Sequence, residues 1–230
     1  MKKILVMLAI SLALSRATTP GAIIISEIMY DPGSTPDNDW EYVEIHNTGV
    51  SAIDLTGYVL DDSTLSLGGA NIATGSISAG GYAVLYDASS LSLSDVQNAW
   101  GSGINFVGVA SWQALNNTGD RIGIWEDFTS YGGGFVNAII DVDYDDSSPW
   151  PAPNNSASIY LTEFALDANS GTSWARSLDG MANAFTSAAA GANLATNVGS
   201  PGIGPVVVPE PSRLLFVLMG VFGMALTRRR

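Results

Sequence analysis

The stretches AIIISEI at residues 22–28 and WEYVEIH at residues 40–46 decide the fold. The first is rich in β-branched side chains and lies between Gly21 and a cluster of turn residues at 31–39, which is typical of a strand. The second alternates, with Val43 and Ile45 on one side and Glu44 and His46 on the other. The domain is therefore expected to begin with two neighbouring strands.

Further strand-like runs follow along the chain, at residues 53–60, 82–86, 121–125, 135–144 and 158–164. Clusters of glycine, asparagine and proline separate them. Only residues 90–100 favour a helical turn, with Ser94 as its cap. Many short strands with turns between them predict an all-β sandwich or barrel. The chain has no cysteine, which excludes a disulfide framework.

Basic residues lie almost entirely at the two ends of the chain. Residues 18–208 contain 21 acidic and 2 basic residues, a net charge of −19, whereas the whole chain carries −13. Such a body is not attracted to nucleic-acid phosphates, which need clustered lysine and arginine. With 47% hydrophobic residues the chain is also too apolar for a disordered acidic polymer, so we expect the body to fold.

The N-terminus follows the pattern of a secretory signal peptide. Lys2 and Lys3 precede an apolar run at residues 4–14, and small residues then offer cleavage after Ser15 or Ala17. This run of eleven residues is too short to span a bilayer, which needs about 20. The sequence therefore predicts a signal peptide over residues 1–17, with a buried helix or an uncleaved anchor as the alternatives.

The C-terminus has three parts in a fixed order. The triplet Pro209-Glu210-Pro211 precedes an apolar run, and Arg228, Arg229 and Arg230 end the chain. The positive-inside rule keeps these arginines in the cytoplasm, so a short transmembrane helix at 214–227 would leave the acidic body on the opposite side.

This ending resembles the PEP-CTERM sorting signal of exported bacterial proteins. The resemblance implies that an exosortase-type membrane enzyme recognises residues 206–230 and removes the tail near the proline–glutamate–proline triplet. An ordinary tail anchor is the alternative interpretation.

Four ordered segments of the body are similar to the lamin-tail domain, an immunoglobulin-like β-sandwich found in nuclear lamins and in many exported bacterial proteins. They are ISEIMYDP (25–32), WEYVEIHNTG (40–49), DLTGYVL (54–60) and LNNTGDRI (115–122). Ser200-Pro201-Gly202 is similar to the family's closing motif, although its asparagine is missing at Gly204-Pro205. The resemblance implies one sandwich over residues 18–205, with an accessory or scaffolding role and no catalytic site.

Candidate catalytic residues are few. His46 is the only histidine, and no G-x-S-x-G elbow accompanies it, so a Ser–His–Asp hydrolase is not indicated. Glu27 and Glu44 lie near the ends of expected strands. They are either a carboxylate pair for acid–base chemistry or, as is commoner, acceptors for turn amides.

Asp141, Asp143 and Asp145 are the candidate ligands for a metal ion, and Ca²⁺ is the cofactor that their spacing suggests. Their spacing fits the start of an EF-hand loop, but Asp146 and Ala152 stand where that loop needs glycine and glutamate. On a strand, the same alternation describes a solvated face, with the residues between the aspartates pointing inward.

Tryptophans near turns are a second candidate binding feature. Trp112, Trp150 and Trp174 either line a glycan-binding surface or pack into the core. Both interpretations stay open at the level of sequence.

Together these features predict an exported, non-enzymatic module of the cell surface or extracellular matrix, whose precursor is held in the membrane by its C-terminal segment. The expected partners are an exosortase-type sorting enzyme and an extracellular polysaccharide or envelope protein, and no nucleic acid. A surface hydrolase that uses an Asp/Glu pair, with or without Ca²⁺, is the alternative. A purely structural matrix component is the third possibility.

Overall fold

The computed structural model describes residues 23–152 and 155–204. Short strands dominate, and the elements in chain order are β1 (Ile23–Met29), η1 (Asn38–Trp40), β2 (Tyr42–Asn47), β3 (Ile53–Asp54), β4 (Val59–Asp61), β5 (Ser76–Ile77), β6 (Tyr82–Asp87), α1 (Leu93–Trp100), β7 (Phe106–Val109), β8 (Gly119–Trp125), α2 (Phe128–Tyr131), η2 (Phe135–Asn137), β9 (Ile140–Asp145), β10 (Ile159–Leu161), η3 (Gly171–Ser173), β11 (Trp174–Arg176), β12 (Phe185–Thr186) and β13 (Val198–Gly199).

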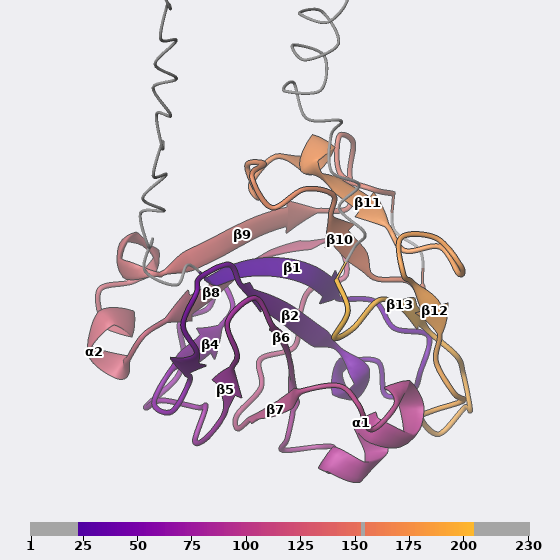
Figure 1. The fold of residues 1–230 in the computed structure, drawn as a ribbon, viewed down its shortest axis with the longest axis horizontal. Coiled ribbons are helices and arrows are strands. Elements are labelled where there is room, and N and C mark those ends of the chain that lie inside the picture. The colour runs from indigo at the N-terminus through magenta and orange to yellow at the C-terminus, as the bar shows by residue number, and fades with distance from the viewer. Residues whose placement is uncertain (1–22, 153–154, 205–230) are drawn as a thin grey trace, which may run out of the picture.

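Two sheets enclose the main core. A six-stranded sheet in the order β11-β10-β1-β2-β6-β7 packs against a three-stranded sheet in the order β4-β8-β9 (Figure 1). All neighbours in these sheets are antiparallel except β6 and β7, which are parallel. The core contains Ile25, Ile45 and Leu85 from the larger sheet and Ile122 and Val142 from the smaller one. The predicted all-β sandwich is confirmed, and the arrangement is consistent with an immunoglobulin-like fold.

A β-bulge at Ser26 sets which residues of β1 face the core. The β1–β2 register pairs Ile25 with Ile45 but Glu27 with Glu44, so one extra residue lies on β1. Side chains alternate along a strand, and an extra residue reverses that alternation. Ile25 and Ile28 can therefore both enter the main core, while Glu27 turns to the opposite face of the sheet.

That opposite face is covered as well. Helix α1 and the C-terminal segment 184–204, here called the C-terminal strap, lie over it (Figure 1). Met29 and Tyr42 from the sheet pack there with Trp100 from α1 and with Phe185 and Ala190 from the strap. All six residues of β2 are buried for this reason.

The structure corrects three local predictions. The run at 135–144 is not one strand, because residues 135–137 form a 3-10 turn before β9 begins at Ile140. The run at 158–164 contributes only the three residues of β10. Strand β7 was not predicted, because it has four residues and one of them is Gly108.

The predicted cap of α1 was wrong by two residues. The N-cap is Ser92, whose side chain accepts from the Asp95 N–H, while the Asp95 carboxylate accepts from the Ser92 N–H at 2.9 Å. This reciprocal capping box satisfies two helix-end donors. The Ser94 hydroxyl lies 2.8 Å from that of Ser92.

Removing the Ser92 side chain should therefore destabilise the protein more than removing that of Ser94. We expect Ser92→Ala to lower the free energy of unfolding by about 1 kcal/mol, the usual effect of losing an N-cap. Ser94→Ala is the matched control and should change it by less than about 0.5 kcal/mol. Urea unfolding measures both, and equal losses would contradict this capping assignment.

The predicted ends of the chain lie outside the described residues. This applies to the signal peptide at 1–17 and to the sorting signal at 206–230, including the apolar helix at 214–227. Among the residues that the structure describes, no helix has the length and apolar character needed to cross a membrane.

Candidate functional site

Glu27 lies at the centre of a buried polar cluster beneath the C-terminal strap. Its Oε1 accepts hydrogen bonds from the Tyr42 hydroxyl at 2.5 Å, the Ser158 hydroxyl at 2.5 Å and the Ser200 N–H at 2.8 Å. Its Oε2 accepts from the Ser200 hydroxyl at 2.6 Å. The side chain has no exposed surface. It acts as an acceptor that joins β1 to β2, to Ser158 just before β10 and to the strap.

Glu44 lies directly opposite Glu27 in the β1–β2 register and is also fully buried. Its Oε1 accepts from the Ser26 hydroxyl at 2.7 Å, and its Oε2 accepts from the Gly202 N–H. Burial, and next the neighbouring Glu27 carboxylate, raise the pKa of Glu44 well above its ordinary value. Burial therefore favours the neutral carboxyl form of Glu44 over the carboxylate.

Both glutamates thus accept amides of the turn at residues 200–202, one from Ser200 and one from Gly202. This is the turn-amide role that was one of the two interpretations of these residues from the sequence. Acid–base catalysis needs a carboxyl group within hydrogen-bonding reach of a substrate. The strap covers both carboxyl groups, so a substrate cannot approach them. Their hydrogen bonds to Ser200 and Gly202 hold the C-terminal end of the domain in place.

His46 packs against two aromatic rings. Its ring centroid lies 4.3 Å from that of Tyr82 and 4.5 Å from that of Phe164. Its Nδ1 lies 3.0 Å from the Gly81 carbonyl, which only accepts, so Nδ1 carries the hydrogen. Burial lowers the pKa of His46 and so favours the neutral ring. The arrangement fits a packed histidine at the end of a strand.

The three candidate calcium ligands alternate along β9. Asp143 and Asp145 are exposed, and Asp141 accepts a hydrogen bond from the Arg121 Nε at 2.8 Å, while Val142 and Tyr144 between them are buried. This is the solvated-face pattern. In the described part of the chain, no group of three or more histidine or acidic side chains is arranged to hold a metal ion.

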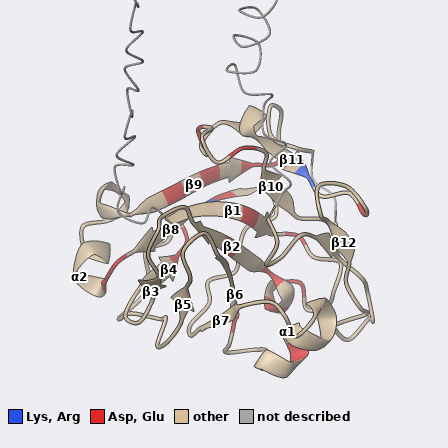
Figure 2. Ribbon diagram, viewed as in Figure 1, with Lys and Arg blue, Asp and Glu red and all other residues tan. Residues whose placement is uncertain are grey.

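Asp143 and Asp145 also border an open groove of about 620 Å³, together with Asp62 and Asp120. Several of these carboxylates already accept local hydrogen bonds. Asp120, for example, accepts from the Arg121 N–H at 2.7 Å, and Asp145 from the Ser147 N–H at 2.7 Å. The acidic groove is one part of a body whose acidic residues are spread over both layers (Figure 2).

The three tryptophans near turns pack into the protein. Trp150 and Trp174 lie 5.9 Å apart and contact the main core, and the Trp174 Nε1 donates to the Ala168 carbonyl. The Trp112 Nε1 donates to the buried Glu41 carboxyl group at 3.0 Å. These side chains therefore have structural roles.

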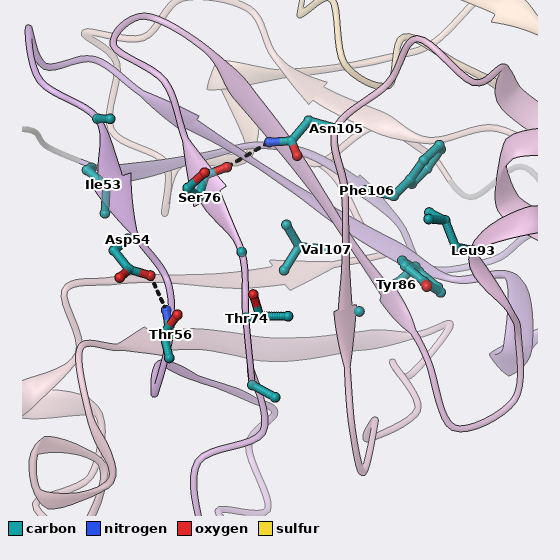
Figure 3. A pocket seen from close by; sticks show the side chains of 14 residues that line it. Ile53, Asp54, Thr56, Thr74, Ser76, Tyr86, Leu93, Asn105, Phe106 and Val107 are labelled. Atoms are coloured by element: carbon teal, nitrogen blue, oxygen red, sulfur yellow. Dashed lines mark hydrogen bonds between the residues drawn. The ribbon is translucent and has the colours of Figure 1, made fainter.

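A groove of about 910 Å³ lies along β7, at the end of the six-stranded sheet (Figure 3). Ligand sites commonly have volumes of about 300–1,000 Å³. We call it the edge groove; it is lined by residues 52–54, 56, 73–76, 86, 93 and 105–108. It joins segments that are far apart in the sequence, so no local sequence pattern marks it.

Two kinds of side chain line the edge groove. Leu93, Tyr86 and Phe106 form an apolar wall, and Figure 3 shows them grouped together, apart from Asp54 and Thr56 on the other side. The Asp54 carboxylate accepts from the Thr56 N–H at 2.9 Å, and the bonds from Thr56 lower the pKa of Asp54. The groove therefore offers apolar surface beside a fixed negative charge.

The family model of the Lamin Tail Domain matches residues 16–129. The match agrees with the sequence motifs, and the matched range includes β1 to β8. No curated protein and no solved structure matches the chain significantly. The described strands continue beyond the matched range through β9 to β13.

The sorting-signal residues Pro209, Glu210, Pro211, Arg228, Arg229 and Arg230 lie outside the described part of the chain. Their role stays a prediction.

Proposed function

We propose that this lamin tail domain is an exported, non-enzymatic binding module of the bacterial cell surface or extracellular matrix, and that the edge groove is its binding surface. The main support for the proposal is that solvent and ligands can reach the edge groove but not the buried carboxyl and imidazole groups. The groove is open to solvent, whereas Glu27 and Glu44 are fully buried beneath the strap. His46 is also buried, and its ring packs against two aromatic rings. Binding needs only the open surface, whereas hydrolysis needs a carboxyl or imidazole group that a substrate can reach.

Export is proposed from the sequence of the two ends. A signal peptide over 1–17 would start translocation, and the PEP-CTERM-like tail at 206–230 would hold the precursor in the membrane for an exosortase-type enzyme. The strap supports this order of events, because its hydrogen bonds to Glu27 and Glu44 fix residues 200–202 just before that tail begins. The folded domain would then remain intact when the tail is cut.

Mass spectrometry of the protein from its native cells tests the sorting step. We expect a mature C-terminus close to Pro209 and an N-terminus close to residue 16 or 18. Retention of Arg230 in the mature envelope protein would contradict exosortase processing.

Binding to isolated cell envelopes tests the groove. The purified domain should bind them, and Leu93→Ser should weaken binding severalfold because it removes an exposed apolar side chain of the groove wall. Leu178→Ser is the matched control, since Leu178 is similarly exposed and lies outside the groove. Equal binding by all three proteins would remove the groove from the proposal, and EDTA-sensitive turnover of polysaccharide or ester substrates would overturn its non-enzymatic part.

A further inference from the structure

Strand β7 ends the six-stranded sheet and leaves one edge of its backbone unpaired. It pairs in parallel with β6, and the Val84 N–H donates to the Asn105 carbonyl at 2.9 Å. A parallel ladder uses every second residue of a strand for one neighbour. Odd-numbered residues of β7 therefore face β6, and the backbone groups of Phe106 and Gly108 face away from it.

Most of these outward backbone groups have no partner strand and lie at the surface of the edge groove. The Phe106 N–H donates locally to the Ile104 carbonyl at 3.1 Å. Directly after β7 on the same edge, the Ala110 N–H donates to the Asn71 carbonyl at 2.8 Å. The Phe106 carbonyl and both backbone groups of Gly108 are left between these bonds, and among the described residues no strand pairs with this side of β7. An open strand edge is a template for another strand.

At the two edges of the smaller sheet, asparagine side chains bond to the outward backbone groups. On β4, the Asn71 side chain accepts from the Leu60 N–H at 2.9 Å and donates to the Leu60 carbonyl at 2.8 Å. On β9, the Asn169 side chain accepts from the Asp143 N–H at 2.7 Å and donates to the Asp141 carbonyl at 3.2 Å. In both places an asparagine amide occupies the positions of a missing strand.

No such amide covers the outer edge of β7 in the described structure. The nearest asparagine, Asn105, turns away and donates to the carbonyls of Ser76 and Tyr82, at 2.9 Å each. This bond joins the β5 side of the groove to the sheet and leaves the β7 edge open.

The two walls of the edge groove match the two faces of an extended chain. Side chains of a strand alternate between its faces, so a strand beside β7 would direct one set toward Leu93 and Phe106 and the other toward Asp54 and Thr56. The first wall suits apolar side chains. The second suits basic or hydroxyl side chains, because Asp54 is negatively charged and the groove lining contains no lysine or arginine.

We propose that the edge groove binds an extended segment of a partner protein, with alternating apolar and basic side chains, as an added strand on β7. The inference rests on the proposed function, because it takes the same groove as the binding surface. Charge decides between partners: a second copy would bring another body of net charge −19, whereas a basic segment is attracted. Backbone pairing would supply affinity, and the two walls would set the register.

A seven-residue peptide of alternating valine and lysine is the probe, with a fluorophore at one end and fluorescence anisotropy as the readout. Two variants carry N-methyl groups, one on its lysine amides and the other on its valine amides. In an added strand, either the lysine amides or the valine amides face β7, but not both. We expect the variant methylated on the amides that face β7 to bind at least about tenfold more weakly than the parent peptide, through loss of at least one hydrogen bond. The other variant should bind like the parent peptide.

Protein variants test the charge contribution. Asp54→Asn should weaken peptide binding about three- to fivefold, and 0.5 M salt should have a similar effect, because both weaken one exposed electrostatic contact. The fold should persist, since an asparagine oxygen can still accept from the Thr56 N–H. Asp179→Asn removes an equal, exposed charge outside the groove and should leave binding unchanged.

Other results would contradict strand addition alone, or strand addition together with the proposed function. Equal binding by both methylated peptides, or no peptide binding at all, would overturn strand addition. If a neutral hexasaccharide such as cellohexaose binds instead and Leu93→Ser weakens it, the groove is a glycan site; the proposed function then stands and the peptide partner is wrong. If neither probe binds and envelope binding is insensitive to Leu93→Ser, both proposals fail.

Discussion

Glu27→Ala is expected to lower the free energy of unfolding by about 3–5 kcal/mol. The substitution leaves the Tyr42 and Ser158 hydroxyls and the two donors of Ser200 without their acceptor in a fully buried place. Each buried donor that loses its partner costs about 1–3 kcal/mol, and hydroxyl groups can partly re-pair by rotating. The main loss is therefore the Ser200 N–H and the space left by the side chain.

Glu44→Ala is the milder comparison, because among the described residues Glu44 accepts from two donors, the Ser26 hydroxyl and the Gly202 N–H. We expect a loss of about 2 kcal/mol. Glu126→Ala removes an exposed glutamate and serves as the control, with an expected change within about 0.5 kcal/mol.

Urea unfolding gives the free energies, and limited proteolysis near residues 197–204 reports on the strap itself. Faster cleavage there in Glu27→Ala, before global unfolding, is expected. If Glu27→Ala matches the Glu126→Ala control in both measurements, then the buried glutamates do not hold the strap. Should Glu27→Ala fail to fold, Ser200→Ala removes only the hydroxyl bond to Glu27 and should cost about 1 kcal/mol with the same local cleavage.

The protein is expected to lose stability as the pH rises from 6.5 to 8.5. Burial raises the pKa of Glu41 to about 8, against 4.5 as its ordinary value. Between these two values the folded chain holds a proton that the unfolded chain has released, so the free energy of unfolding falls with pH and levels off above about 8. One pKa unit corresponds to about 1.4 kcal/mol, so Glu41 contributes a loss of about 2 kcal/mol between pH 6.5 and 8.

Glu44 and His46 also change the free energy of unfolding with pH, in opposite directions. Glu44 has a raised pKa and adds to the loss. His46 has a lowered pKa, so it favours folding as the pH rises, but only up to about 6.5, where the unfolded imidazole becomes neutral. The window above pH 6.5 therefore isolates the carboxyl groups.

Glu41→Gln provides the check on this assignment. An amide oxygen can still accept from the Trp112 Nε1 and the Leu115 N–H, the two donors that now reach Glu41. Thermal melting at pH 6.5 and 8.5 should show a smaller decrease for Glu41→Gln than for the unchanged protein. An identical decrease in both would exclude Glu41 as the source.

Motifs and alternation predicted much of the larger sheet. The runs at 22–28 and 40–46 correspond to β1 and β2, and Val43 and Ile45 face the main core as expected. These predictions succeeded because β-branched runs and alternation are properties of short, local segments. The same reasoning missed β7, whose four residues include Gly108.

The candidate site was harder to predict because its parts come from distant segments. The role of Glu27 and Glu44 as acceptors for turn amides was one of two interpretations, and the partners in the strap lie more than 150 residues away along the chain. The edge groove likewise joins residues 52–54 and 56 with residues 73–76 and 105–108. Local pattern carries no information on which of these segments meet.

The sequence by itself determined the all-β class, the lamin tail domain motifs and the net charge of −19 over residues 18–208, because composition, short-range alternation and motif order are readable along the chain. Tertiary structure alone decided three other features: the bulge at Ser26 that turns Glu27 away from the core, the strap that seals both glutamates, and the open edge of β7. Each depends on pairing between segments far apart, and the free energy of such pairing comes from burial and hydrogen bonds that exist only once the chain has folded.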